Sequence, residues 1–542
     1  MATERDQTTI SKDYDANVEL LEKILAVGTN FDVISRPYEF GGKRLNFLFC
    51  DGLINSNIFL LITKTLAAIT REDIAIHTLD KLVETYMTHV QTSTEDDIDK
   101  IVDSVLAGRV AVVVENEVKV ILIEARSYPA RGPEEPDLER VVRGSRDGFV
   151  ETIIHNTALI RRRVRDPKLR TEMLQCGTRS KTDICVCYIE EIANPGLVEE
   201  IKGRIENISI DGLPMAEKSV EELITKGGQW NPFPQVRYTE RPDVAAAHLL
   251  EGHVLIIVDT SPSIMIAPTT FFHHVQHAEE YRQAPVVGAY IRWVRFFAII
   301  SSLVILPTWL LVALEPGLLP KSLQFIGPAK VGKIPLIGQF VLAELGLDML
   351  RMAAIHTPSP LTTALGLIAA FMIGDVAIKI GLFAPETIMY LAFAAVGTFA
   401  TPSYEMGMAL RLCRFLLILL VGLFKLPGLI IGYATLLILL ATYKSFGVPY
   451  LWPLIPFNWK ALKAILVRYP VPITNSRPSI LKPVDKSRQP GGHSTLMSPA
   501  RKPLDKQSDT KYEEIFEDVA GLKKYKRGKQ KGGHREHKPP EK

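Results

Sequence analysis

Three charged residues on one apolar stretch are the first with a definable chemical role. Glu344, Asp348 and Arg351 follow one another at intervals of four and three residues, so they share one face of a helix. Acidic side chains that line a narrow passage of low dielectric constant attract cations and repel anions. We therefore name Glu344 and Asp348 as first candidates for such a lining, with Asp375 and Glu386 as second candidates. The alternative is that Glu344, Asp348 and Arg351 form ion pairs with one another at the level of the lipid headgroups.

Two further motifs have the spacing of metal ligands, and we assign a metal ion to neither. Residues 259–263 read D-x-S-x-S after a predicted strand, as in a metal-ion-dependent adhesion site, but no large domain follows to supply the other ligands. We predict a turn between two strands there. His273 and His277 stand at the i, i+4 spacing of zinc ligands with His274 beside them, yet there is no HExxH motif and no third ligand. We predict a surface or juxtamembrane histidine cluster.

A run of arginines closes the carboxyl end of a helix predicted over residues 149–164. Cations suit that end of the helix dipole. Nucleic-acid binding is disfavoured, because no aromatic residues are interleaved with the basic ones and the neighbouring segments are acidic. We therefore take the run as a candidate subunit interface, with a solvated face as the alternative; it consists of Arg161, Arg162 and Arg163.

Catalytic machinery is not predicted. The sequence has no nucleophile and base at recognisable spacing, no phosphate-binding glycine loop and no cofactor fingerprint. We expect no enzyme, no cofactor and no bound metal. A metal-dependent enzyme that uses Asp259 is the third and weakest of the functions considered.

The candidate acidic residues belong to an apolar block that is long enough for a bilayer. Residues 296–314 contain no charge over 19 positions, and a helix of ~20 residues crosses ~30 Å of hydrocarbon. Backbone groups in lipid must be bonded internally, so each spanning piece is helical. We predict a membrane domain over 286–470 with about four spanning helices; they are 296–314, 361–378, a segment between Glu386 and Glu405, and one long kinked helix at 415–443.

The segment 334–356 is predicted to be amphipathic and either interfacial or re-entrant, since its charges share one face. Small residues four apart let helices touch closely, and we assign helix packing to Gly366, Ala370, Gly374, Gly428 and Gly432. Four crossings return the chain to the cytoplasm.

That topology would put Arg411 and Arg414 outside, against the preference of positive charge for the cytoplasm.

Soluble segments flank the apolar block. Alternating helix and strand patterns predict an α/β cytosolic region of two subdomains, 41–135 and 136–285, after a polar segment 1–40. Residues 471–542 are predicted to be a basic disordered tail, because from residue 476 there are 17 Lys and Arg against 9 Asp and Glu. The five cysteines are scattered and predict no disulfide framework. No cleavable signal precedes residue 30, so the amino-terminal part should be cytosolic.

Five segments, in order along the chain, carry a recognisable pattern; they are EARSYPARGPEEPDLERVVRGSRDGFVETIIHNTALIRRRVRDPKL (124–169), YIEEIANPGLVEEIKGRIENISIDGL (188–213), FPQVRYTERPDVAAAHLLEGHVLIIVD (233–259), IAPTTFF (266–272) and KSFGVPYLWPL (444–454). They resemble the A subunits of bacterial spore germinant receptors. The resemblance covers roughly residues 15–475, and the segments 127–137 and 259–281 are most similar to the branch called stage V sporulation protein AF.

The resemblance implies a multi-pass protein of the spore inner membrane that acts in germination, with both termini cytoplasmic. It implies a homo-oligomer whose membrane helices surround an ion-conducting path. Expected partners are copies of the same chain, membrane lipid, and either another small membrane protein or germinant receptor subunits. A scaffold that does not conduct ions is the second function considered.

Overall fold

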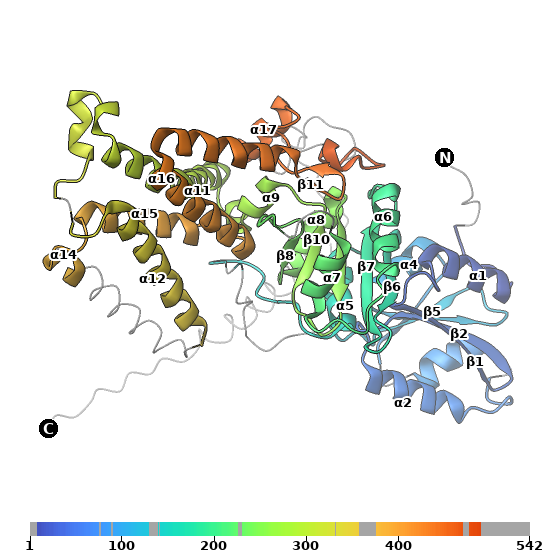
Figure 1. The fold of residues 1–542 in the computed structure, drawn as a ribbon. Coiled ribbons are helices and arrows are strands. Elements are labelled where there is room, and N and C mark those ends of the chain that lie inside the picture. The colour runs from blue at the N-terminus through green and yellow to red at the C-terminus, as the bar shows by residue number, and fades with distance from the viewer. Residues whose placement is uncertain are drawn as a thin grey trace, which may run out of the picture. The chain divides into compact units, whose positions relative to one another are not determined.

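The computed structural model describes residues 8–74, 77–87, 90–128, 139, 141–225, 230–330, 332–356, 375–469 and 476–488. Two five-stranded sheets come first along the chain, and a group of helices follows (Figure 1). Every strand pair in both five-stranded sheets is antiparallel. The predicted α/β character of the region before the long helices is confirmed, and the strand direction is a feature that the alternation of elements did not indicate.

The first subdomain is a sheet covered by helices on both faces. Its strands, in the order β1-β2-β4-β5-β3, are Val33–Phe40 (β1), Lys43–Cys50 (β2), Val110–Val114 (β4), Val120–Ile123 (β5) and Thr92–Glu95 (β3). One face packs on α1 (Tyr14–Leu25) and α4 (Ile98–Leu106), and the other packs on α2 (Ser56–Ala67), α3 (Thr78–Lys81) and a π-helical turn at Leu82–Tyr86. Strands β4 and β5 form a hairpin, with Asn116 at φ 64° in its turn.

The second subdomain repeats this layering. Its strands, in the order β6-β7-β9-β10-β8, are Leu169–Cys176 (β6), Thr182–Ile189 (β7), Val254–Val258 (β9), Ile264–Ala267 (β10) and Arg237–Thr239 (β8). Helices α5 (Ile153–Arg163) and α8 (Pro242–Glu251) cover one face, and α6 (Pro195–Glu206) and α7 (Ala216–Ile224) cover the other. The predicted turn at 259–263 joins β9 to its antiparallel partner β10 and is confirmed.

The helical part holds four long helices in the described residues: α11 (Pro285–Leu314), α12 (Leu336–His356), α15 (Pro385–Phe399) and α16 (Tyr404–Thr442). By length and composition, α11 and α16 could each cross a membrane. At 15 residues, α15 is about 22 Å long, shorter than ~30 Å of hydrocarbon. The shorter elements are α9 (Phe271–Val275), α10 (Glu279–Arg282), α14 (Ala377–Lys379), α17 (Trp459–Leu466), the two-residue strands β11 (Lys444–Ser445) and β12 (Val448–Pro449), and 3-10 turns at Pro316–Leu318, Lys321–Ile326 and Ser479–Leu481.

Helix α16 is a hairpin of two antiparallel arms, so the predicted single long kinked helix is wrong. The backbone leaves the helical region at Lys425, with φ 54° and ψ −128°, just before Pro427. A Cβ atom on Gly432 would lie 2.5 Å from Cδ2 of Leu417, whereas a continuous helix would separate the two residues by about 22 Å. A Cβ atom on Gly428 would likewise lie 2.1 Å from the Leu420 carbonyl oxygen in the first arm. Both arms lie beside α11 (Figure 1).

Helix α12 runs alongside the first arm of α16 in the opposite direction. Its Ile337 packs against Gly422 near the far end of the arm, and its Arg351 contacts the sulfur of Met408 near the beginning. The segment predicted to be interfacial or re-entrant therefore contacts neighbouring helices along most of its length. Three of the predicted packing residues, Gly366, Ala370 and Gly374, lie outside the described residues.

Candidate functional site

A cluster of four charged side chains lies between α12 and the first arm of α16. Arg414 donates from Nε to Oε1 of Glu344 at 2.7 Å and from Nη2 to Oε2 at 3.1 Å, a bidentate pair. Arg411 donates from Nη2 to the Glu344 carbonyl at 3.0 Å, and its Nη1 lies 2.7 Å from Oδ1 of Asp348. Both the Glu344 and the Arg414 side chains are 1% exposed. Their position therefore depends on the ion pair, since an unpaired buried charge costs several kcal/mol.

The remaining donors of Arg414 join two more helices to the cluster. Its Nη1 donates to the carbonyls of Ser302 in α11 at 3.0 Å and Ala394 in α15 at 3.4 Å, and lies 3.2 Å from the hydroxyl of Thr398. The helices approach closely because residue 397 is glycine: a Cβ there would lie 2.3 Å from the Ala298 carbonyl oxygen. One guanidinium of α16 thus contacts the other three long helices.

Asp348 is the member of the cluster that reaches a surface. Its side chain is 40% exposed, while the Arg411 side chain that pairs with it is 4% exposed. The neighbouring exposed residues of α12 are apolar; they are Leu345, Met349 and Met352. A carboxylate therefore stands at the edge of an apolar helix face, at the depth of the buried ion pairs.

The structure brings two of the four predicted acidic residues together and leaves the other two apart. Asp375 pairs with Lys379 at 2.5 Å, and Glu386 accepts a hydrogen bond from the Ala329 backbone at 3.0 Å. The pore-lining role of all four residues, Glu344 and Asp348 included, stays a prediction.

Sequence reasoning missed the cationic half of the cluster. Arg411 and Arg414, which the predicted topology put outside the membrane, are buried inside the helical part. Two arginines three residues apart in an otherwise apolar run need carboxylate partners. Glu344 and Asp348, four residues apart in another apolar run, could have been identified as these partners.

The three arginines taken as a subunit interface all have partners within the chain. Arg161 has no exposed surface and pairs with the buried Asp32 of the first subdomain, Nε to Oδ2 at 2.6 Å. Arg162 is exposed, with its guanidinium 4.5 Å from the centre of the Tyr128 ring. Arg161 therefore joins the two subdomains and has no surface with which to contact a second copy.

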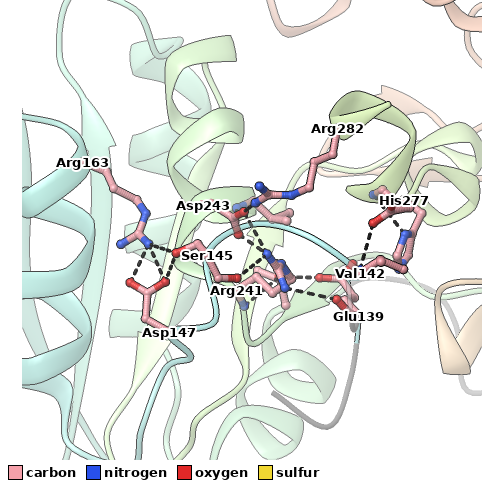
Figure 2. A network of polar contacts seen from close by, with 12 residues as sticks. Glu139, Val142, Ser145, Asp147, Arg163, Arg241, Asp243, His277 and Arg282 are labelled. Atoms are coloured by element: carbon pink, nitrogen blue, oxygen red, sulfur yellow. Dashed lines mark hydrogen bonds and ion pairs between the residues drawn. The ribbon is translucent and has the colours of Figure 1, made fainter. Parts of the chain in front are cut away.

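Arg163 belongs to a polar network that ties Glu139 and residues 141–147 to the second subdomain (Figure 2). Its Nη2 donates to Oδ1 of Asp147 at 2.7 Å. Burial raises the pKa of Asp147, but the hydrogen bonds from Arg163 and Ser145 outweigh it and leave that pKa below its usual value. At the other end of the segment, the fully buried Arg241 donates to the carbonyl oxygens of Ser145 at 3.0 Å and Glu139 at 3.3 Å.

The network continues to the start of the helical part. Asp243 accepts from Nε and Nη2 of Arg241 at 3.1 and 3.0 Å and also from Arg282, three residues before α11 (Figure 2). The backbone N–H of Val142 donates to Glu279 at 3.2 Å. Glu139 and residues 141–147 are thus held by both the second subdomain and α10.

Within the predicted surface or juxtamembrane histidine cluster, His274 is buried. Its Nδ1 lies 3.3 Å from the Ser403 hydroxyl, immediately before α16. The rings of His248, His253 and His273 pack edge to face with centroids 4.9–5.8 Å apart. Burial lowers the pKa of His248 and of His274 to about 3, so these imidazoles are neutral near pH 7.

Comparison with known proteins assigns the chain to a family. The family model described as Bacillus/Clostridium GerA spore germination protein matches residues 19–480. Stage V sporulation protein AF of Bacillus subtilis is 52% identical over 88% of this chain and 96% of its own. Spore germination protein GerLA of Bacillus cereus is 30% identical over 86% of this chain and 95% of its own, and spore germination protein KA of Bacillus subtilis is 29% identical over 85% and 86%.

Among solved structures, the N-terminal domain of the A subunit of the Bacillus megaterium spore germinant receptor GerK3 is 26% identical. It covers 49% of this chain and 99% of that one, with a TM-score of 0.39. The resemblance to germinant receptor A subunits and to the stage V sporulation protein AF branch is confirmed. Germinant receptor family proteins are membrane-associated, and two helices of this chain could span a membrane. The chain is therefore a member of the GerA family of spore germination proteins.

Proposed function

We propose that this protein is a homo-oligomeric ion-channel subunit of the spore inner membrane that contributes to ion release early in germination. Family membership supports the process, and the two long apolar helices support the location. In this proposal both termini are cytoplasmic and the helical part crosses the membrane several times. The chain performs no catalysis and needs no cofactor.

The partly exposed Asp348 carries the proposal. A carboxylate at bilayer depth is costly against lipid tails and is retained where it faces protein or water. In one copy of the chain it lies on an apolar face of α12. Association of copies through this face would shelter Asp348 and place a ring of carboxylates around a shared axis, an arrangement that favours cations.

The buried members of the cluster have a different role in the proposal. Glu344 is held by Arg414 and Arg411, so it fixes α12 against α16 instead of presenting free charge to a passage. Asp348 is consequently the stronger of the two first candidates. Asp348 forms an ion pair with Arg411 at 2.7 Å, and this ion pair would form or break as the charge in the passage changes.

Ion flux through vesicles tests the proposal. The full-length protein in liposomes should release trapped potassium or sodium, and Asp348→Asn should reduce that flux several-fold because the carboxylate is lost while the side-chain volume is kept. The matched control is Asp211→Asn, on an exposed cytosolic carboxylate that pairs with Arg179. A well-formed oligomer without conductance, or equal flux from both variants, would overturn the proposal.

A scaffold that does not conduct ions is the second candidate, and the charge balance of the cluster favours it. The two carboxylates and two guanidiniums sum to a formally neutral group. A neutral cluster holds helices together without attracting ions. In this case the protein would organise another small membrane protein or germinant receptor subunits, and Glu344→Ala with Asp348→Ala would leave germination activity intact wherever the protein still accumulates.

A further inference from the structure

Two segments far apart in the sequence meet at the beginning of α11. Arg292 of α11 donates from Nη1 to the Ile465 carbonyl of α17 at 2.6 Å. Arg468, just after α17, donates in return to the carbonyls of Gln283 at 2.6 Å and Tyr281 at 2.7 Å. The short helix α17 is therefore fastened to the start of α11 from both sides.

Buried charge lies where α17 meets the start of α11. Glu280 is fully buried, 2.6 Å from Nε of Arg292 and in contact with Arg295. Gly288 allows the close approach, because a Cβ atom there would lie 2.2 Å from the Glu280 carbonyl oxygen and 2.9 Å from Cδ of Arg468. The orientation of α17 relative to α11 is thus fixed by packing.

The outer surface of the joint is aromatic. Tyr290, Trp293 and Phe297 follow one another at intervals of three and four residues along α11 and are exposed, whereas Arg292 of the same helix is buried. Trp459, the first residue of α17, and Phe457, two residues before it, are also exposed. We call these five residues the aromatic collar; their exposed fractions range from 52% for Trp293 to 72% for Phe297.

Basic residues stand beside the collar. Lys460 and Lys463 lie on one side of α17 and are exposed. Among the residues that the structure describes, neither ammonium group has an acidic partner within 4 Å. Aromatic rings with adjacent cations are typical of the boundary between lipid tails and anionic headgroups, where amphipathic rings are favoured and each lysine strengthens attachment roughly fivefold.

We propose that the aromatic collar, together with Lys460 and Lys463, seats the protein on the anionic membrane leaflet that faces its cytosolic subdomains, with α17 lying in the headgroup layer. The α11 part of the collar continues along the helix to Ile300, three residues after Phe297, which is 62% exposed. This continuity, together with the unpaired lysines, favours lipid over a protein partner. The inference rests on the proposed membrane crossing of α11.

Tryptophan quenching in vesicles tests the inference. The full-length protein is reconstituted in phosphatidylcholine vesicles with and without phosphatidylglycerol, using lipids brominated near the headgroups or near the bilayer centre. The fluorescence lost in Trp459→Phe gives the contribution of Trp459, and Trp230→Phe does the same for Trp230, a control that is 94% exposed in the second subdomain. We expect headgroup-level bromine to quench Trp459 several-fold more than Trp230, and aqueous iodide to do the reverse.

The test separates this inference from the proposed function. If iodide but not lipid quenches Trp459, while Trp293→Phe shows that lipid quenches Trp293, α11 enters the bilayer and the collar proposal is wrong. If lipid quenches neither residue, the membrane crossing itself is wrong. If Trp459 is shielded from both quenchers, a second copy or another protein covers α17, which also overturns the proposal.

Substitution of the lysines tests the charge requirement. In the unaltered protein, lipid quenching of Trp459 should rise when phosphatidylglycerol is included. Lys460→Gln with Lys463→Gln should abolish that rise, because no cation then faces the headgroups, whereas Lys64→Gln on the exposed side of α2 should preserve it. Quenching that is independent of phosphatidylglycerol in the unaltered protein would contradict an anionic partner.

Discussion

Replacement of Arg161 by methionine should separate the first and second subdomains. The guanidinium lies 2.6 Å from one carboxylate oxygen of Asp32 and 3.0 Å from the other, and both side chains are 1% exposed. Methionine keeps the packing volume but leaves Asp32 with only the Thr171 hydroxyl, which donates to it at 2.6 Å. Removing one partner of a buried ion pair costs roughly 3–5 kcal/mol, because the other charge stays buried.

Amide hydrogen exchange is the appropriate assay, because the two subdomains share backbone contacts beside the ion pair. The N–H of Phe31 donates to the Thr171 carbonyl at 3.1 Å, and the N–H of Thr171 donates to Oδ1 of Asn30 at 3.0 Å. A loss of 3–5 kcal/mol in local opening energy corresponds to exchange faster by roughly a hundredfold to a few thousandfold at these amides.

The matched control is Arg162→Met, next to Arg161 on the same helix. Arg162 is exposed, and its guanidinium lies over the Tyr128 ring. Such an exposed cation–π contact is worth about 0.5–1 kcal/mol. Adding Asp32→Leu to Arg161→Met should recover part of the loss, since no uncompensated charge then remains. Equal exchange in the two single variants, or a double variant as damaged as Arg161→Met, would refute the argument.

Three further outcomes are expected from the thermal unfolding midpoint of the detergent-solubilised protein. The midpoint should fall as pH drops below ~6.5, because His248 and His274 bind protons in the unfolded state but not in the folded state, where burial lowers their pKa to about 3. By pH 5 this difference costs roughly 2 kcal/mol of folding stability for each histidine. His248→Gln should therefore make the midpoint depend less on pH. Gly397→Ala should lower the midpoint by overpacking worth about 1–3 kcal/mol, whereas Gly346→Ala, with nothing within 4 Å of its added Cβ, should not. Lys425→Gly should raise the midpoint, because φ 54° is strained for lysine and its relief stabilises the fold by about 1 kcal/mol. An unchanged midpoint between pH 7 and 5, equal effects of the two alanines, or a lower midpoint for Lys425→Gly would contradict the respective argument.

Local features of this fold were predictable because their causes are local. The β4–β5 hairpin follows from two short aliphatic runs around three polar residues, and Asn194 caps α6 one residue before Pro195. The layered α/β architecture follows from the alternation of such elements. Whether strands pair parallel or antiparallel depends on which distant strands become neighbours, and the sequence pattern carries no signal for that choice.

Features set by distant contacts were not predictable. The α16 hairpin reverses at Lys425 and Pro427 within an almost uncharged run, where composition does not distinguish a kink from a reversal. The site shows the same limit. Glu344 and Asp348 could be recognised from their spacing, but the arginine that neutralises Glu344 lies 70 residues further along the chain. Without that partner, Glu344 looked like a free pore-lining charge.

Self-association through the α12 face that bears Asp348 is the central claim, and the mass of the full-length complex in mild detergent tests it most directly. The account predicts a single species at an integral multiple of the 60.4 kDa chain mass, after correction for bound detergent. It also predicts that this species shifts towards the single-chain mass when bulky charge is introduced beside Asp348, as in Met349→Arg. A protein that is uniformly one 60.4 kDa chain under conditions where it stays folded would contradict the account.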